Sequence, residues 1–152
     1  MKFRRAVRED IGEIQALYHI LFQEMAALQP EYFKETPQDV GFLEQAIESE
    51  EADILLAEEE RIIGFVYVHQ QAAPFFGCFI PHVYTYVMDI AVLPSAQGQG
   101  VGRSLMEEAE GWAKARGSDH LELDVLCQNE RAIAMYEGLG YEECKKTMRK
   151  RV

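Results

Sequence analysis

Cysteine is scarce in this chain, and its three cysteines are far apart. Cys78, Cys127 and Cys144 form no CxxC pair and no cluster with histidine, so no spacing typical of a metal site is present. The N-terminal residues are charged and are not followed by an apolar run, so they do not resemble a signal peptide. Together with the odd number of cysteines this fits a reducing compartment, and we expect a cytoplasmic location. The four histidines are scattered, and we expect each to be structural or on the surface: His19, His69, His82 and His120.

Long hydrophobic runs and an excess of positive charge are also missing. No stretch reaches about 18 apolar residues, so we expect no membrane span. Asp and Glu number 26 against 15 Lys and Arg, which leaves a net charge of −11. A chain this acidic lacks the basic face that phosphate contacts require, so we expect no nucleic-acid partner. The excess of acidic residues favours cationic partners such as amines, or it simply provides a solvated surface.

The length and the apolar content point to one globular domain. The chain has 152 residues, of which 48% are hydrophobic. A chain of this size can bury a self-sufficient core, so we expect a single domain over residues 1–152. Hydrophobic periodicity then predicts an α/β protein with a mixed sheet flanked by helices, in the order β-α-α-β-β-β-α-β-α-β. The expected strands are Lys2–Val7, Asp53–Glu58, Ile62–Gln70, Val83–Leu93, Leu121–Leu126 and Tyr141–Met148.

Turn and cap residues locate the expected helices. The first begins at Ile11 behind Asp10, a plausible cap, and Pro30 ends it; Pro37 can open the second. The third, over Gly100–Arg116, has a clear apolar stripe and Gly117 just past its end. The fourth follows Asn129 as cap and ends at Gly140. Between strands, the loop Ala73–Pro81 is apolar enough to suggest a contact surface.

A glycine-rich segment, Gln97–Ser104, stands between a strand end and a helix start. Free backbone N–H groups at a helix N-terminus attract an anion, and glycines let the backbone approach a diphosphate closely. The segment is not a Walker A loop, because Arg103 follows Gly102 and Gln97 stands where a glycine is needed. Arg103 also breaks the dinucleotide-binding GxGxxG pattern. The remaining alternative is a tight turn without a ligand.

The pattern Q-x-x-G-x-G, formed by Gln97, Gly100 and Gly102, resembles the pyrophosphate loop of the GNAT acetyltransferases. The preceding stretch 88–94 is similar to the strand before that loop in the family. Downstream, residues 129–141 resemble the second family signature, N-x-x-A-x-x-x-Y-x-x-x-G-[FY]. The resemblance covers residues 84–148, and the N-terminal half matches in element order only. It implies the GNAT acyl-CoA N-acyltransferase fold.

The resemblance also implies a cofactor, acetyl-CoA, with coenzyme A as product. Two neighbouring strands would splay apart to admit the pantetheine arm. Backbone groups of Ile90, Ala91 and Val92 would pair with the pantetheine amides. The residues implied to hold the rest of the cofactor are Gln97, Gly98, Gln99, Gly100, Val101, Gly102, Arg103, Ser104 and Asn129, with Tyr136 near its sulfur.

Three side chains are candidates for the chemistry. Tyr136 matches the family's usual general acid, which protonates the departing thiolate; otherwise it is a core tyrosine. A base must deprotonate the amine, and the sequence leaves open Asp124, Asp89 or a purely structural role for each. A backbone N–H near Val92 would hold the oxyanion. A covalent mechanism through Cys127 is disfavoured, because direct attack needs no cysteine.

The expected activity is transfer of an acetyl group to a primary amine of a small molecule, peptide or protein by direct attack. The family's acceptor site corresponds to Leu21–Tyr32 and Ala73–Tyr86, where aromatic and acidic side chains suit a cation. Alternatives are an acetyl-CoA sensor without turnover, a transferase for a longer acyl group or an oxygen acceptor, and an interaction subunit. A homodimer through Ala73–Pro81 or the last strand stays open.

Overall fold

The computed structural model describes residues 1–152 and contains one five-stranded mixed sheet in the order β1-β2-β3-β4-β5. The first four strands are antiparallel neighbours, and β5 pairs in parallel with β4. The strand bounds are Lys2–Arg5 (β1), Ala52–Glu58 (β2), Ile62–Ala72 (β3), Val83–Val92 (β4) and Leu121–Leu123 (β5). Residues 59–61 join β2 to β3, so these two antiparallel strands form a hairpin.

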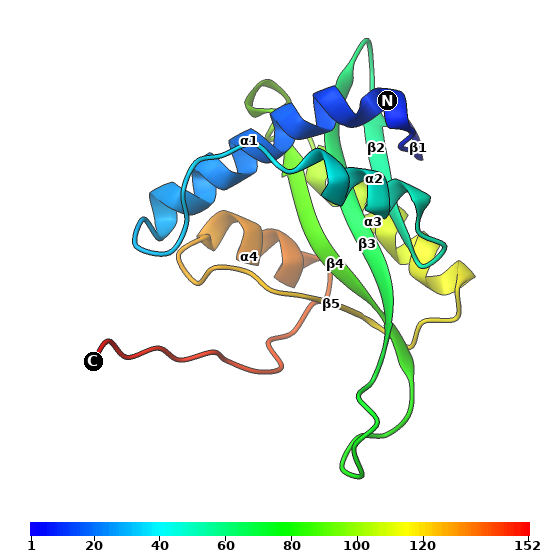
Figure 1. Cartoon of the computed structure of the whole chain (residues 1–152), viewed down its shortest axis with the longest axis vertical. Coiled ribbons are helices and arrows are strands. Elements are labelled where there is room, and N and C mark those ends of the chain that lie inside the picture. The colour runs from blue at the N-terminus through cyan, green and yellow to red at the C-terminus, as the bar shows by residue number, and fades with distance from the viewer.

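Helices cover both faces of this sheet (Figure 1). The helix bounds are Ile11–Leu28 (α1), Val40–Glu48 (α2), Val101–Ala115 (α3) and Glu130–Gly138 (α4), with 3-10 turns at Arg8–Asp10 and Pro94–Ala96. α1 and α2 lie on one face, and α3 crosses the other (Figure 1). No helix combines the length and the apolar character that crossing a lipid bilayer would take.

The central strands have nearly continuous apolar sequences because both of their faces are buried in the core. Seven consecutive residues of β3, Ile62–Val68, are buried because helices lie on both of its faces. Ile14, Leu17 and Tyr18 of α1 enter the core from one side. The inner stripe of α3 enters from the other side, as its periodicity predicted.

A β-bulge interrupts β4 at Met88. Tyr67 of β3 lies opposite Asp89, whereas the next residue, Val68, lies opposite Val87, so Met88 is the extra residue. The pairing of β4 with β5 ends at the same place, since the last paired residue of β4 is Val87. The two parallel strands therefore separate from Met88 onward, as the family resemblance implied.

Two predicted helix starts were wrong in detail. Asp10 does precede α1, but its carboxylate accepts hydrogen bonds from Arg4 and from the Val7 N–H and caps nothing in the helix. Pro37 lies outside α2, which begins at Val40, where the Asp39 side chain accepts a hydrogen bond from the Phe42 N–H. Asn129 caps α4 through its hydrogen bond from the Ala132 N–H, as predicted.

The predicted sixth strand, Tyr141–Met148, is absent. Residues 141–152 form neither helix nor strand, and all but Tyr141 are exposed; they run away from the sheet (Figure 1). The apolar positions of this segment, Tyr141, Cys144 and Met148, do not alternate, so a strand would have no apolar face to bury. The fifth strand is also shorter than the predicted Leu121–Leu126, because β4 turns away at the bulge.

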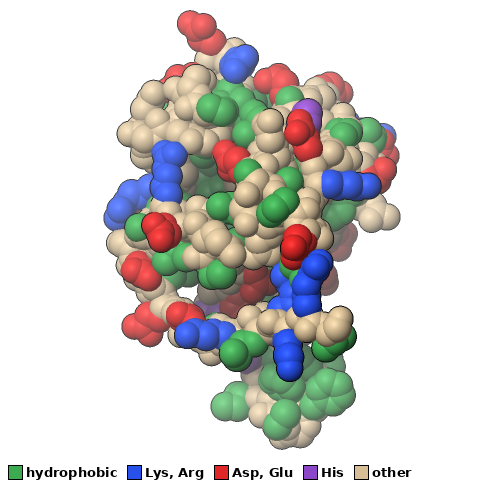
Figure 2. Space-filling model, turned by 90° about the vertical axis from the view of Figure 1, so that its left-hand side faces the viewer, with side chains coloured by type: hydrophobic (Ala, Val, Ile, Leu, Met, Phe, Trp, Pro, Cys, Tyr) green, Lys and Arg blue, Asp and Glu red, His purple; other side chains and the backbone are tan.

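The β3–β4 connection projects from one end of the molecule (Figure 1). Its tip is apolar: Phe75 is 95% exposed and Ile80 is 80% exposed, with Phe76 and Phe79 also open to solvent. In the space-filling view, hydrophobic side chains gather on this lower projection, below a belt of Lys and Arg (Figure 2). The apolar loop expected at Ala73–Pro81 is therefore at the surface.

Candidate functional site

The glycine loop presents free backbone donors at the start of α3. Gly98 and Gly100 have positive φ angles of 76° and 81°, which only glycine adopts without strain. The first amide to hydrogen-bond back along the helix is Ser104, which donates to the Gly100 carbonyl. The N–H groups of the six residues Gly98–Arg103 donate no hydrogen bond within the protein. An anion is the natural acceptor for such a row.

Gln97 and Gly102 also link this loop to the rest of the protein. The Gln97 amide donates to the Val92 carbonyl, and its oxygen accepts a hydrogen bond from Arg131 of α4. A Cβ atom at Gly102 would lie 3.2 Å from the sulfur of Met135, so this glycine lets α4 approach α3 closely. Sequence reasoning assigned both residues to the cofactor alone and missed these structural roles.

The other predicted loop residues differ in what their side chains contact. Arg103 is exposed and lies 3.6 Å from Glu107 on the next helical turn, so it is free to move toward an anion. Gln99 donates to the Ser95 carbonyl from the outer side of the loop. The Ser104 side chain makes no hydrogen bond within the protein, whereas Asn129 uses its side-chain oxygen to cap α4.

One edge of β4 is unpaired beyond the bulge. Ile90, Ala91 and Val92 lie opposite β3 on one side, but β5 no longer reaches them on the other. Backbone groups on the open edge are free to pair with an extended ligand. The Val92 carbonyl is the exception, because Gln97 already donates to it.

Asp89 directly follows the bulge and lies in a largely apolar environment. The Tyr18 hydroxyl of α1 donates to its carboxylate at 2.7 Å. Burial raises the pKa of Asp89 to about 6, and the hydrogen bond from Tyr18 limits that rise. A carboxylate with a pKa near 6 is a better proton acceptor than an exposed one, and it is still ionised at neutral pH.

Tyr136 of α4 is buried close to this carboxylate. Only 8% of its surface is exposed, and burial together with the negative charge of Asp89 raises its pKa to about 12. The phenol is therefore protonated at neutral pH and can donate a proton or a hydrogen bond. The Asp89 charge thus reaches Tyr136, and Tyr18 is a hydrogen-bond partner of Asp89 that the sequence did not link to it.

Asp124 has a different environment. It is exposed, just past the end of β5, and accepts a 2.7 Å hydrogen bond from the Tyr86 hydroxyl on β4. Burial and this hydrogen bond to Asp124 raise the pKa of Tyr86, and the charge of Asp89 adds to the effect. The two candidate carboxylates therefore lie on either side of the gap between β4 and β5.

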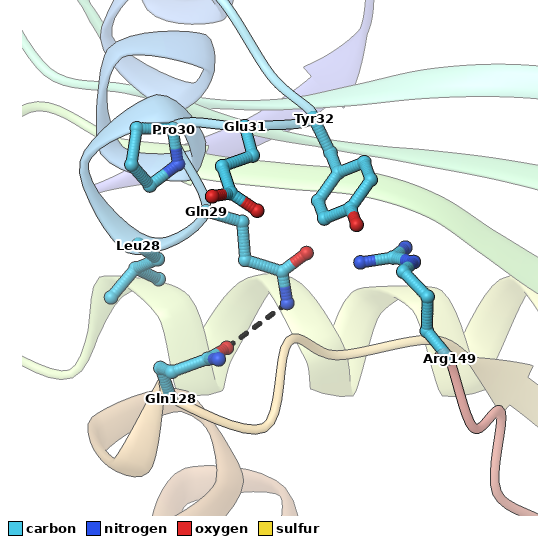
Figure 3. Close-up of a pocket in the computed structure, with 7 residues that line it drawn as sticks. All are labelled: Leu28, Gln29, Pro30, Glu31, Tyr32, Gln128 and Arg149. Atoms are coloured by element: carbon cyan, nitrogen blue, oxygen red, sulfur yellow. Dashed lines mark hydrogen bonds between the residues drawn. The ribbon is translucent and has the colours of Figure 1, made fainter. Parts of the chain in front are cut away.

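A pocket of about 350 Å³ opens where the end of α1 meets the segment before α4 (Figure 3). Its lining residues are Leu28, Gln29, Pro30, Glu31, Tyr32, Gln128 and Arg149. The Gln29 amide donates to Gln128 across it, and the Arg149 guanidinium lies 3.6 Å from the centre of the Tyr32 ring. Arg151 pairs with Glu31 at 3.4 Å. This acidic and aromatic wall therefore already receives cations from the C-terminal segment.

Sequence comparison relates the chain to known N-acetyltransferases. The chain is 29% identical over 147 residues to the uncharacterized N-acetyltransferase YhfO of Bacillus subtilis (strain 168), covering 94% of this chain and 91% of YhfO. It is 44% identical over 57 residues to the ribosomal protein bS18 alanine N-acetyltransferase of Escherichia coli (strain K12), covering 38% of each chain.

Solved structures extend the likeness to the whole chain. A mutant of the BH1408 protein of Bacillus halodurans superposes with a TM-score of 0.95 at 26% identity, covering 100% of this chain and 99% of that one. The aminoglycoside N-acetyltransferase AAC(6')-Iy, in complex with CoA, shares the fold with a TM-score of 0.76 at 18% identity, covering 99% and 98%. The Acetyltransferase (GNAT) family matches residues 14–141, and the chain belongs to that family.

Proposed function

We propose that this protein transfers the acetyl group of acetyl-CoA to a primary amine by direct attack, with Asp89 as general base and Tyr136 as general acid. The observation that carries the proposal is the placement of these two groups. A carboxylate with a raised pKa follows the bulge at which β4 leaves β5, and it is near enough for its charge to raise the pKa of a protonated phenol on α4.

The loop and the open strand edge fit acetyl-CoA. The six N–H groups of Gly98–Arg103 would bind the pyrophosphate, and Arg103 would add a charge-assisted contact. Space around Gly98 and Gly100 supports this fit, since a Cβ atom at either residue would meet no atom within 4 Å. The Ile90 backbone groups and the Val92 N–H, which face away from β3, would pair with the pantetheine amides, and Asn129 and Ser104 are further candidate contacts.

Asp89 is the better of the two candidate bases. When bound, acetyl-CoA supplies an acetyl thioester that an uncharged amine can attack, so the ammonium form must first lose a proton. Asp89 would accept that proton, because burial has raised its pKa toward the working pH. Asp124 is exposed and would instead orient Tyr86 or the acceptor.

Tyr136 would complete the proton balance. As the bond between the acetyl carbon and sulfur breaks, the phenol donates its proton to the departing thiolate. The attacking nitrogen still carries a second proton, which passes to the Tyr136 phenolate, while Asp89 releases the first proton to solvent. One proton is released per turnover, and the free enzyme is restored. A backbone N–H near Val92 would stabilise the oxyanion.

The acceptor side favours a cationic amine. The contacts of Tyr32 with Arg149 and of Glu31 with Arg151 support this preference, because a cationic amine would meet the same ring and carboxylate. The net charge of −11 would also draw an amine toward the protein. A small amine or a basic peptide is the acceptor class we propose.

The first test is thermal unfolding with and without acetyl-CoA, using Gly98→Asp and its matched control Gly98→Asn. Asn and Asp adopt a positive φ more readily than other non-glycine residues and carry a similar strain here, so the two variants differ mainly in the charge next to the pyrophosphate. Ligand at 100 times its dissociation constant should stabilise the wild type by about 2.7 kcal/mol. We expect that shift to be largely kept by Gly98→Asn and lost by Gly98→Asp.

Turnover is tested next, by following thiol release with a panel of amines. Release that depends on the amine supports the transferase. A thermal shift with no amine-dependent release would reduce the protein to an acetyl-CoA-binding module. No shift at millimolar acetyl-CoA would overturn the proposal.

A further inference from the structure

Two histidines that are far apart in the sequence lie close together at one end of β4, and the glycine loop follows the other end of this strand. His82 immediately precedes β4, and His120 immediately precedes β5. Their ring centres are 5.4 Å apart, and one ligand atom from each, together with one from Asp119, lies within 4.8 Å of the others. The parallel pairing of β4 with β5 produces this cluster, and so the sequence spacing gave no sign of it.

The far nitrogen of each ring is already occupied. His82 Nδ1 lies 2.7 Å from the Ile80 carbonyl oxygen, which fixes a proton on Nδ1 and leaves the Nε2 lone pair free. His120 Nε2 lies 2.9 Å from Glu122, while its Nδ1 lies 2.8 Å from Asp119. A ligand histidine typically donates its second N–H to a carbonyl or a carboxylate in this way.

Stacking also fixes the orientation of the central ring. The imidazole of His120 lies parallel to the Tyr84 ring, with an interplanar angle of 2° and centres 5.2 Å apart. Ring orientation set by neighbouring contacts is a property of built metal sites, where ligands must be held before the ion arrives.

We propose that His82, His120 and Asp119 form a binding site for a divalent transition-metal ion, zinc above all. His82 Nε2, His120 Nδ1 and an Asp119 oxygen are the ligands, and Glu122 holds the His120 ring from behind. Two imidazoles and one carboxylate suit zinc, with water in the fourth position. Neighbouring ligands of tetrahedral zinc are roughly 3.3 Å apart, so His82 must move closer to the other two ligands. The His120 Nδ1–Asp119 hydrogen bond of 2.8 Å must give way to the two metal bonds.

The ion would fasten the base of the β3–β4 loop to the start of β5. His82 ends the apolar loop, where its carbonyl accepts a hydrogen bond from the Ala73 N–H, and Asp119 donates its own N–H to the Val83 carbonyl. Mg²⁺ and Ca²⁺ prefer oxygen ligands, so they should not compete. The site is separate from the proposed acetyl-transfer centre and does not depend on it.

Isothermal titration of the untagged full chain with ZnCl₂, and with MgCl₂ as the control ion, tests this site. We expect one saturable zinc site in the wild type and no magnesium binding. His82→Ala, His120→Ala and Asp119→Asn should each weaken zinc binding at least about 10-fold, and Glu122→Gln should weaken it about 10- to 100-fold. His19→Ala is the matched control: its ring also contacts a carboxylate, Glu35 at 2.7 Å, but no second histidine.

Thermal unfolding without metal checks that each variant is folded, and His82→Gln replaces any alanine variant that is not. The absorption spectrum of bound Co²⁺ gives an independent measurement of the nitrogen and oxygen ligand set. Unchanged zinc affinity in His82→Ala and His120→Ala would overturn the proposal. So would equal losses in His19→Ala, a sulfur-type cobalt spectrum that Cys78→Ser removes, or no zinc binding in the wild type.

Discussion

Two tyrosine–aspartate hydrogen bonds flank the gap between β4 and β5, and they are equal in length but not in surroundings. Tyr18 donates to Asp89 at 2.7 Å, and Tyr86 donates to Asp124 at 2.7 Å. The first pair is enclosed by α1 and the sheet, with Tyr18 fully buried. The second reaches from β4 to an aspartate open to solvent.

This difference separates the chemistry of the two carboxylates. Asp89 is half-buried beside Tyr18, so desolvation disfavours its ionised form, whereas Asp124 is open to solvent. Burial raises the pKa of Asp89 to about 6 even though the hydrogen bond from Tyr18 opposes the rise. Burial, rather than hydrogen bonding, therefore selects Asp89 as the proposed base.

The largest expected effect on activity comes from replacing the two carboxylates themselves. Asp89→Asn keeps the shape and the hydrogen bond from Tyr18 but cannot accept a proton. We expect kcat/KM for the best amine to fall between about 100- and 1,000-fold, and Asp124→Asn to lower it less than about 10-fold. Steady-state kinetics at saturating acetyl-CoA measures both. The reverse order would assign the base to Asp124.

The next largest effect concerns Tyr136, the proposed general acid. Tyr136→Phe removes the proposed proton donor from a buried site, and we expect kcat to fall about 100-fold with the acetyl-CoA thermal shift retained. Tyr141→Phe is the matched control, since its ring lies 5.8 Å from that of Tyr136 and its buried hydroxyl has no hydrogen-bond partner. Equal losses in the two variants would indicate a packing effect instead of proton donation.

The sequence predicted those parts of the fold that local chemistry determines. The bounds of α3 follow from Gly100 and Gly117, whose positive φ angles mark its two ends, and Asn129 caps α4 as its side chain suggests. Prediction failed where a residue distant in the sequence determines the local structure. Asp10 binds Arg4 instead of capping α1, and residues 141–148 find no strand partner.

The site shows the same division. The glycine loop and both aspartates could be located from motif spacing, but their environments could not. The pairing of Tyr18 with Asp89 joins α1 to β4, and that of Gln97 with Arg131 joins the loop to α4. The His82–His120 cluster was missed for the same reason, because only the parallel pairing of β4 with β5 brings the two rings together.

A smaller effect concerns stability. The folded-state pKa of Asp89, about 6, exceeds its ordinary value of 3.8, so the folded protein binds this proton more tightly than the unfolded chain. The stability that this proton provides is therefore present below about pH 4 and is lost as the pH rises through about 6. We expect Asp89→Asn to be more stable than wild type by about 3 kcal/mol at pH 7.5, with the gap closing near pH 4.

Urea unfolding at the two pH values measures this gap. Asp124→Asn, at an exposed position, should change the unfolding free energy by less than about 0.5 kcal/mol at either pH. A destabilised Asp89→Asn at pH 7.5 would mean that the carboxylate is a structural acceptor. In that case the lost activity of this variant could not be assigned to proton transfer.

The smallest expected effect is a shift in the pH dependence of activity, which distinguishes Tyr18 from Tyr86. Tyr18→Phe removes the hydrogen bond that lowers the pKa of Asp89, so this pKa should rise further. In the wild type we expect the acid limb of the kcat/KM profile near pH 6. In Tyr18→Phe the limb should move up by about one pH unit, with the rate at high pH nearly unchanged. Tyr86→Phe, measured with the same amine, should leave the limb in place, because its hydroxyl contacts Asp124. Equal shifts in both variants would show that the profile reports the amine or a shared structural change, and Asp89 would lose its support as the base.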